Sequence, residues 1–190
     1  LILDDNFNIK ALKEGLSQCS SATIEVEYGL TTYTRNQFWS NTDKFYWYGP
    51  VHEVLMCDKP SKPAGFLKGL RTLVTADGAS WTNQTQQEKY EKDSKLLLDY
   101  VQNDPKKDPR WVFYLAQSYR DAVTPQNLVE SIKWYTARRD MNSGYREERY
   151  YSQLMVATLK SRLNSLNTQG KFPTRYSNAE ILSDYSLCTD

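Results

Sequence analysis

The hydrophobic residues of the chain change their spacing near residue 86, and this change constrains the fold more than any other feature. Before it, apolar and polar residues alternate, as in residues 22–28, which is typical of a strand with one buried face. After it, apolar residues recur every three or four positions, which is the spacing of a helix with one buried side. We therefore predict an α+β chain with a strand-rich domain over residues 1–82 and an all-α domain over residues 83–190.

The strand-rich part is expected to contain short strands joined by turns. A short helix is expected over residues 9–16, where apolar residues fall at 9, 12 and 16. Residues 58–65 hold two Lys-Pro pairs and are expected to form a loop. Strands are expected at residues 1–3, 22–28, 33–39, 45–48 and 51–56.

The second part predicts helices stacked as antiparallel hairpins, because prolines and a glycine separate its helical segments. Trp111, Trp134 and Tyr135 are interpreted as core residues, and Val123 is placed on the same helix as Trp111. Small and aromatic residues occupy positions like those of a tetratricopeptide repeat, although residues 123–130 are longer than its tight turn. Helices are expected from about 86 to 103, from 109, from 125, from about 146 to 163, and from 178 to 187.

The charge balance excludes several classes of partner. Lys and Arg number 24 and Asp and Glu 23, a formal charge of +1, so neither nucleic acid nor an anionic membrane is an expected partner. No apolar run approaches the roughly 20 residues of a membrane helix. The 3 cysteines are widely spaced, which favours a reducing compartment and a cytoplasmic location. The basic residues between Lys133 and Arg149, including Arg138, alternate with acidic ones and are expected to form a solvated helix face.

An acidic run follows the first expected strand. Leu1 to Leu3 lead directly into Asp4, Asp5 and Asn6. Because residues two apart on a strand share a side, Asp4 and Asn6 can face one cation together, and such oxygen ligands suit Mg²⁺ or Mn²⁺ bridging a diphosphate. The same run could equally cap the helix over residues 9–16. Both interpretations stay open at this point.

A second polar motif is Gly49-Pro50-Val51-His52-Glu53, which contains the only histidine. A neutral imidazole could complete the coordination of a divalent ion, and the adjacent carboxylate could take a proton from an attacking hydroxyl. A histidine next to a strand is more often simply packed or hydrogen-bonded. Strict alternation would also separate His52 from Glu53, so a shared site needs a backbone bend. The aromatic residues 46–48 could stack on a sugar or pack internally.

These motifs, in this order, resemble a known family. The Asp4-Asp5-Asn6 tip, Tyr33-Thr34-Arg35 and residues 45–55 resemble the second half of a family 2-like glycosyltransferase domain of the GT-A fold. Three later segments resemble the tetratricopeptide-like region that follows that domain in one branch of the group. They are residues 89–98, Phe113-Tyr114-Leu115-Ala116-Gln117-Ser118-Tyr119-Arg120-Asp121 and Gly144-Tyr145-Arg146-Glu147-Glu148. The resemblance covers nearly the whole chain.

The resemblance implies a metal-dependent, inverting transfer from a nucleotide-sugar to a hydroxyl of a glycan or protein. Asp4 and Asn6 would hold Mn²⁺ or Mg²⁺ against the diphosphate, with His52 on the same ion. Glu53 would be the general base, and Trp47 would line the acceptor side. The residues expected to bind substrate are Asp5, Arg35 and Trp47.

Two departures from the family qualify what is expected. Asn6 stands where the family usually has Asp, which predicts weaker ion binding. The family's nucleotide-binding half would precede Leu1, so the chain is expected to be the C-terminal portion of the enzyme. The alternative is a non-catalytic helical-repeat module that binds a protein partner, with residues 1–80 as a remnant. Convergence of Asp4, Asn6 and His52 would favour the enzyme, and burial of His52 away from Asp4 the module.

Overall fold

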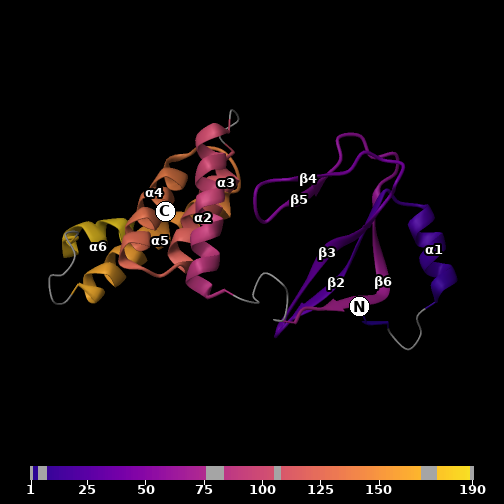
Figure 1. Ribbon diagram of the computed structural model, residues 1–190, viewed down its shortest axis with the longest axis horizontal. Coiled ribbons are helices and arrows are strands. Elements are labelled where there is room, and N and C mark those ends of the chain that lie inside the picture. Colours follow the sequence, from indigo (N-terminus) through magenta and orange to yellow (C-terminus); the bar gives the residue numbers. More distant parts are fainter. Residues whose placement is uncertain (1, 4–7, 76–83, 105–107, 168–174, 189–190) are drawn as a thin grey trace. The chain divides into compact units, whose positions relative to one another are not determined.

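The computed structural model describes residues 2–3, 8–75, 84–104, 108–167 and 175–188. The chain divides into two compact units, Leu1–Ala79 and Ser80–Asp190, which we call the sheet unit and the helical unit. Strands occur in the first and helices dominate the second (Figure 1), so the expected α+β class is confirmed.

The sheet unit holds a four-stranded sheet in the order β1-β6-β2-β3 and a separate two-stranded hairpin, β4-β5. β6 is antiparallel to β1 and parallel to β2, and β2 is antiparallel to β3. Figure 1 shows helix α1 beside β6. The elements are β1 (Ile2–Leu3), α1 (Ile9–Ser17), β2 (Ser21–Tyr28), β3 (Thr31–Trp39), β4 (Tyr46–Tyr48), β5 (Val54–Met56) and β6 (Ala64–Leu73).

The core of the sheet unit follows from the alternation in β2. Ala22 and Ile24 are fully buried and pack with Leu67 and Leu70 of β6. Leu12 and Leu16 of α1 cover the same cluster, which is why the helical spacing of the α1 segment was informative. The core is small, and most side chains of β3 and β4 remain exposed or half-buried.

Strand β6 was not predicted, although it lies between β1 and β2. The expected loop extended to residue 65, and β6 already begins at Ala64. Its pairing with β2 shifts register between Thr23 and Glu25, and Gly69 has a positive φ of 78°. This irregularity interrupts the period-2 pattern by which a strand is found in a sequence.

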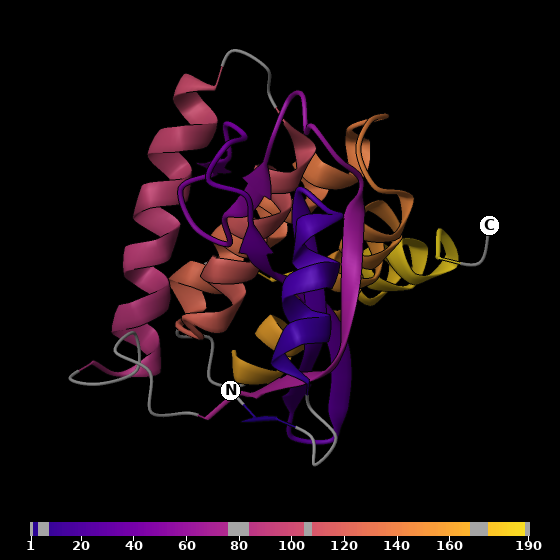
Figure 2. The ribbon, with the colours of Figure 1, turned by 90° about the vertical axis from the view of Figure 1, so that its right-hand side faces the viewer.

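The helical unit consists of helices that each pack against the next, and α3 also contacts α5. α2 lies beside α3 (Figure 2). Pro109 and Pro125 occupy first-turn positions of their helices, where the missing amide proton costs nothing. The elements are α2 (Gln86–Asn103), α3 (Pro109–Asp121), α4 (Pro125–Asp140), α5 (Arg146–Leu166) and α6 (Asn178–Ser186), and the expected helices are confirmed.

The core of the helical unit is larger and rich in aromatic residues. Trp111 and Tyr135 are fully buried, as expected, whereas Trp134 is only half-buried at the edge of the cluster. Val123 was expected on α3 but lies beyond its end, with a φ of 65° and an exposed side chain. The buried cluster comprises Phe113, Ala116, Leu128, Ile132, Tyr135, Val156, Leu159 and Leu163.

The expectation of a solvated face was wrong for Arg138, whose side chain is completely buried. Its Nη2 donates to the carbonyl oxygen of Tyr145 at 2.8 Å and to Glu148 at 3.2 Å. Gly144 has a φ of 79°, and a Cβ there would lie 3.0 Å from Pro109 and 3.1 Å from Arg138. The α4–α5 connection therefore closes over the guanidinium group.

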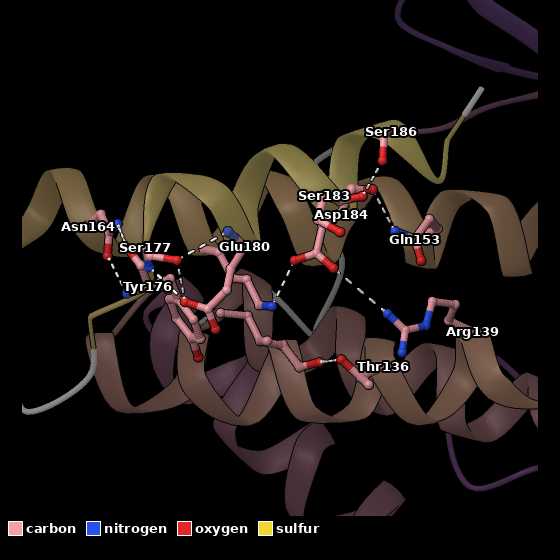
Figure 3. Close-up of polar contacts among 12 residues, drawn as sticks. Thr136, Arg139, Gln153, Asn164, Tyr176, Ser177, Glu180, Ser183, Asp184 and Ser186 are labelled. Carbon is pink, nitrogen blue, oxygen red and sulfur yellow. Dashed lines mark hydrogen bonds and ion pairs between the residues drawn. The ribbon is translucent and has the colours of Figure 1, made fainter.

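Several polar contacts join α5 to α6 and to the segment before it (Figure 3). Lys160 Nζ donates to the carboxylate of the buried Asp184 at 2.7 Å, and Gln153 Nε2 donates to its carbonyl oxygen at 2.7 Å. Asn164 exchanges two hydrogen bonds with the backbone of Tyr176. Ser177 and Glu180 form a capping box at the start of α6.

Over the ranges that the structure describes, no helix is both long and apolar enough to span a bilayer.

Candidate functional site

The acidic residues Asp4, Asp5 and Asn6 lie outside the described residues, so their geometry stays a prediction. The structure does identify the N-cap of α1, which is Asn8. Its Oδ1 accepts hydrogen bonds from the backbone amides of Lys10 at 2.9 Å and Ala11 at 3.2 Å. The capping role that was an alternative for the acidic run is therefore filled by Asn8.

His52 and Glu53 lie in the connection between β4 and β5, and both are exposed. The hairpin pairs Trp47 with Leu55 and Tyr48 with Val54. Within the connection, Gly49 has a φ of 115° and His52 a φ of 52°. The expected bend is present, so the separation that strict alternation would impose on His52 and Glu53 does not apply.

The backbone of His52 is in the left-handed region, which non-glycine residues seldom adopt. Such a conformation costs on the order of 1 kcal/mol and persists where the surroundings or a function require it. Two consecutive exposed residues, His52 and Glu53, thus lie in the β4–β5 connection. The pair can bind a cation or exchange protons with a solvent-accessible ligand.

Trp47 lies on β4 with 53% of its surface exposed. Its ring meets Trp39 of β3 edge to face, with centroids 5.8 Å apart and an interplanar angle of 86°. Tyr46 is also exposed, and its hydroxyl donates to Asp58, which raises the pKa of Tyr46. The aromatic strand thus presents Tyr46 and Trp47 to solvent, whereas Tyr48 is half-buried.

Arg35 is exposed on β3, opposite Ile24 of β2. Trp39 pairs with Ser21, and a register shift separates the two pairs. Directly paired residues of neighbouring strands point to the same side, and Ser21 and Ile24 are three positions apart. Arg35 and Trp39 therefore leave the sheet on opposite faces, and the sheet does not bring Arg35 to the Trp39–Trp47 pair.

Among the residues with described positions, no group of three or more His, Cys, Asp or Glu side chains is placed to hold a metal ion. Of the expected metal ligands, only His52 falls within this part of the chain. All three cysteines, Cys19, Cys57 and Cys188, are free thiols.

Sequence patterns did not predict a polar cavity beside Trp39, which forms where the ends of α1, β2 and β3 meet the loop before β6. Ser20 and Ser61 contribute to it from positions 41 residues apart. The only local signal was the clustering of Ser17, Ser20 and Ser21 around the end of α1, which is common near loops and carries no specific chemistry.

No family model matches the chain, and no curated protein matches it either.

Proposed function

We propose that the chain is the C-terminal portion of a metal-dependent, inverting glycosyltransferase that moves a sugar from a nucleotide-sugar to a hydroxyl acceptor. The observation that carries the proposal is the exposed His52-Glu53 pair, held at the end of the β4–β5 hairpin with His52 in a left-handed conformation. A residue kept in a costly backbone conformation at a solvent-exposed tip favours a functional role over a packing role.

The donor set suits the expected ion. Asp4, Asn6 and His52 would supply carboxylate, amide oxygen and imidazole ligands, a combination that Mn²⁺ accepts well and Mg²⁺ accepts through its oxygens. The assignment of Asn8 as the cap of α1 supports this use of the acidic run, because the competing role is taken. A divalent ion held there would offset the negative charge that develops on the departing diphosphate.

Other residues of the chain would accept the proton and bind the substrates. Glu53, with its carboxylate in solvent, would accept the proton of the acceptor hydroxyl as the oxygen attacks the anomeric carbon. Trp47, exposed and braced by Trp39, would support the acceptor. Asp5 and Arg35 would bind the substrate. Arg35 lies on the sheet face opposite to Trp39, so we assign it to a different part of the substrate from Trp47.

The test uses the full-length protein and a panel of nucleotide-sugars with a Mn²⁺-containing buffer. Release of nucleoside diphosphate and labelling of an added acceptor are measured for Glu53→Gln and for the control Glu25→Gln, an exposed carboxylate on β2. We expect Glu53→Gln to lower transfer by about 100-fold or more and the control to remain active. Equal activity of Glu53→Gln and the control would contradict the role of Glu53.

A second candidate function is a non-catalytic module that binds a protein partner, favoured by the exposed apolar side chains Tyr150, Tyr151 and Leu154 on α5. His52 is exposed, so the burial that would favour this alternative is not observed. The two functions separate in cells that depend on the protein. Loss of function in Leu154→Asp but not in Glu53→Gln would favour the module, and the reverse pattern the enzyme.

A further inference from the structure

A cavity of about 230 Å³ lies at one end of the four-stranded sheet, within the sheet unit. Its apolar lining residues are Leu16, Phe38 and Trp39. Trp39 as a residue is 42% exposed, so it is not sealed in the core. The volume is below the roughly 300–1,000 Å³ of sites for drug-sized ligands, which indicates a ligand of about one six-membered ring.

The wall of the cavity is held in place by Ser20, which is 2% exposed. Its Oγ accepts a hydrogen bond from the backbone amide of Lys62 at 2.7 Å and lies 3.3 Å from the hydroxyl of Ser61. Its backbone amide donates to the carbonyl of Pro63 at 3.1 Å, and its carbonyl accepts from the amide of Ser40 at 2.8 Å. One buried residue thus ties together three segments of the wall.

Asp43 extends this network on the outer side. Its carboxylate accepts from both the amide and the hydroxyl of Ser61, at 3.2 and 3.1 Å. Hydrogen bonding, from Ser20 first and then from Ser61, lowers the pKa of Asp43, so the network favours the anionic form of this acceptor. A wall that is already hydrogen-bonded loses little conformational entropy when a ligand enters.

The polar side of the cavity consists mainly of hydroxyl groups. Ser21, Ser40 and Thr42 line it, and the hydroxyls of Ser40 and Thr42 are 2.6 Å apart. Each hydroxyl can serve as one donor and two acceptors, so the Ser40–Thr42 pair keeps capacity for a ligand. Neutral donors and acceptors in such number match a ligand that is itself rich in hydroxyl groups.

Lys62 is the one charged residue among the described residues that line the cavity. Its Nζ donates to the carbonyl of Ser17 at 2.6 Å, which holds the amine against the end of α1. Phosphate or carboxylate recognition usually draws on several cationic donors or on the guanidinium fork of arginine. The lining therefore favours a neutral polyhydroxylated ligand over an anion.

We propose that this cavity binds a single pyranose ring, with an apolar face of the sugar against Trp39 and its hydroxyls toward Ser21, Ser40 and Thr42. Binding needs neither a divalent ion nor a nucleotide-sugar, so the site is separable from the transfer chemistry. If the proposed function holds, the site would in addition retain a sugar of the acceptor, and only that extension rests on it.

The test is a titration of the ¹⁵N-labelled chain with the methyl pyranosides of glucose, galactose and mannose, in the presence of a chelator. Amide shifts of Ser40, Thr42 and Lys62 are followed by NMR. We expect saturable shifts with at least one glycoside and a Kd of about 1–10 mM, since a ligand with about a dozen non-hydrogen atoms gains limited affinity. Inorganic phosphate and the open-chain hexitol sorbitol serve as comparison ligands.

Trp39→Leu keeps an apolar residue but removes the ring, and it should weaken binding by about tenfold or more. The matched control is Tyr33→Leu, which removes an equally exposed aromatic from the same strand, 43% against 42% exposed. Thr42→Phe, at an exposed position, should obstruct the cavity without disturbing the core.

Retained binding in Tyr33→Leu together with loss in both Trp39→Leu and Thr42→Phe would support the proposal, and unchanged binding in Trp39→Leu would overturn it. Absence of saturable shifts with all the glycosides would overturn it. Equal binding of sorbitol, or binding of phosphate alone, would overturn it as well. Because a chelator is present, failure here is distinct from failure of the metal-dependent transfer.

Discussion

The two units of the chain each contain one non-glycine residue with a left-handed backbone among the described positions, and the settings differ. Val123 follows the end of α3, where a left-handed residue closes a helix and glycine is the usual choice. His52 lies in an exposed hairpin connection, next to the only carboxylate of that connection. The backbone cost at Val123 has a structural explanation at the end of a helix, whereas for His52, in a hairpin connection, we propose a functional one.

The hydrophobic cores of the two units also differ in size and in aromatic content. The helical unit buries a cluster of eight residues that includes Phe113 and Tyr135, whereas the buried cluster of the sheet unit contains Ala22, Ile24, Leu67 and Leu70. Large aromatic residues of the sheet unit, such as Trp39 and Trp47, remain about half exposed. Fully buried aromatic residues thus stabilise the helical unit, whereas Trp39 and Trp47 of the sheet unit contribute less to a core.

The largest effect on stability is expected at Arg138. Arg138→Met leaves the carboxylate of Glu148, which is 13% exposed, without its buried partner. Removing one member of a buried pair costs about 3–5 kcal/mol, so chemical denaturation should show a loss of about 3 kcal/mol. Arg149→Met, at an exposed position of α5, is the control and should change stability little.

The double variant Arg138→Met/Glu148→Leu separates charge from packing. It removes both charges, and much of the lost stability should return. A single variant as stable as the wild type would show that the buried pair does not hold the α4–α5 connection.

Replacing the left-handed residues by glycine should have a smaller effect on the free energy of unfolding, and it should raise it. Val123→Gly should stabilise the protein by about 1 kcal/mol, because glycine adopts a positive φ without steric cost. His52→Gly should gain a similar amount in stability while losing transfer activity. Thermal unfolding and the transfer assay, run on both variants, measure this directly. Full activity in His52→Gly would remove the functional reason for its conformation.

The smallest effect concerns the cap of α6. Hydrogen bonds from the backbone and then the hydroxyl of Ser177 lower the pKa of Glu180 below its ordinary value of 4.5. A carboxyl group with a lower pKa in the folded state contributes stability above its unfolded pKa and loses it as pH falls through the folded value. The contribution of Glu180 should therefore be present at neutral pH and disappear below about pH 4.5.

Glu180→Gln should show a flatter decline of stability in this acidic range than the wild type. Helical circular dichroism between pH 7 and 3 would record it. An unchanged decline in the variant would indicate that other carboxylates, such as Glu88 in the similar cap of α2, account for the whole acid response.

How much could be predicted from the sequence depended on local pattern. The helices were predictable, because Pro109 and Pro125 mark helix starts and the apolar spacing between them is regular. Strand β6 was not, since Gly65 and Gly69 lie within it and its pairing is irregular. Burial of Arg138 also escaped prediction, because its partner Glu148 and the closing Gly144 act only after α4 and α5 have packed.

The same distinction between local and long-range features applies to the candidate site. The bend at His52 could be anticipated from Gly49-Pro50, which is a local signal. The cavity beside Trp39 could not, because it is assembled from segments around residues 20, 40 and 62 that are far apart in the chain. The spacing of residues in the sequence does not show which distant segments come together in the fold.

The proposed function requires that the acidic run and the single imidazole hold one divalent ion. His52 is the only histidine of the chain, so its imidazole proton signals are unambiguous in NMR spectra. On titration with substoichiometric Mn²⁺ and a nucleoside diphosphate, we predict that these signals broaden first and that Asp4→Ala prevents this. Sharp imidazole signals while carboxylate-rich regions elsewhere broaden, or unchanged broadening in Asp4→Ala, would contradict a shared ion site.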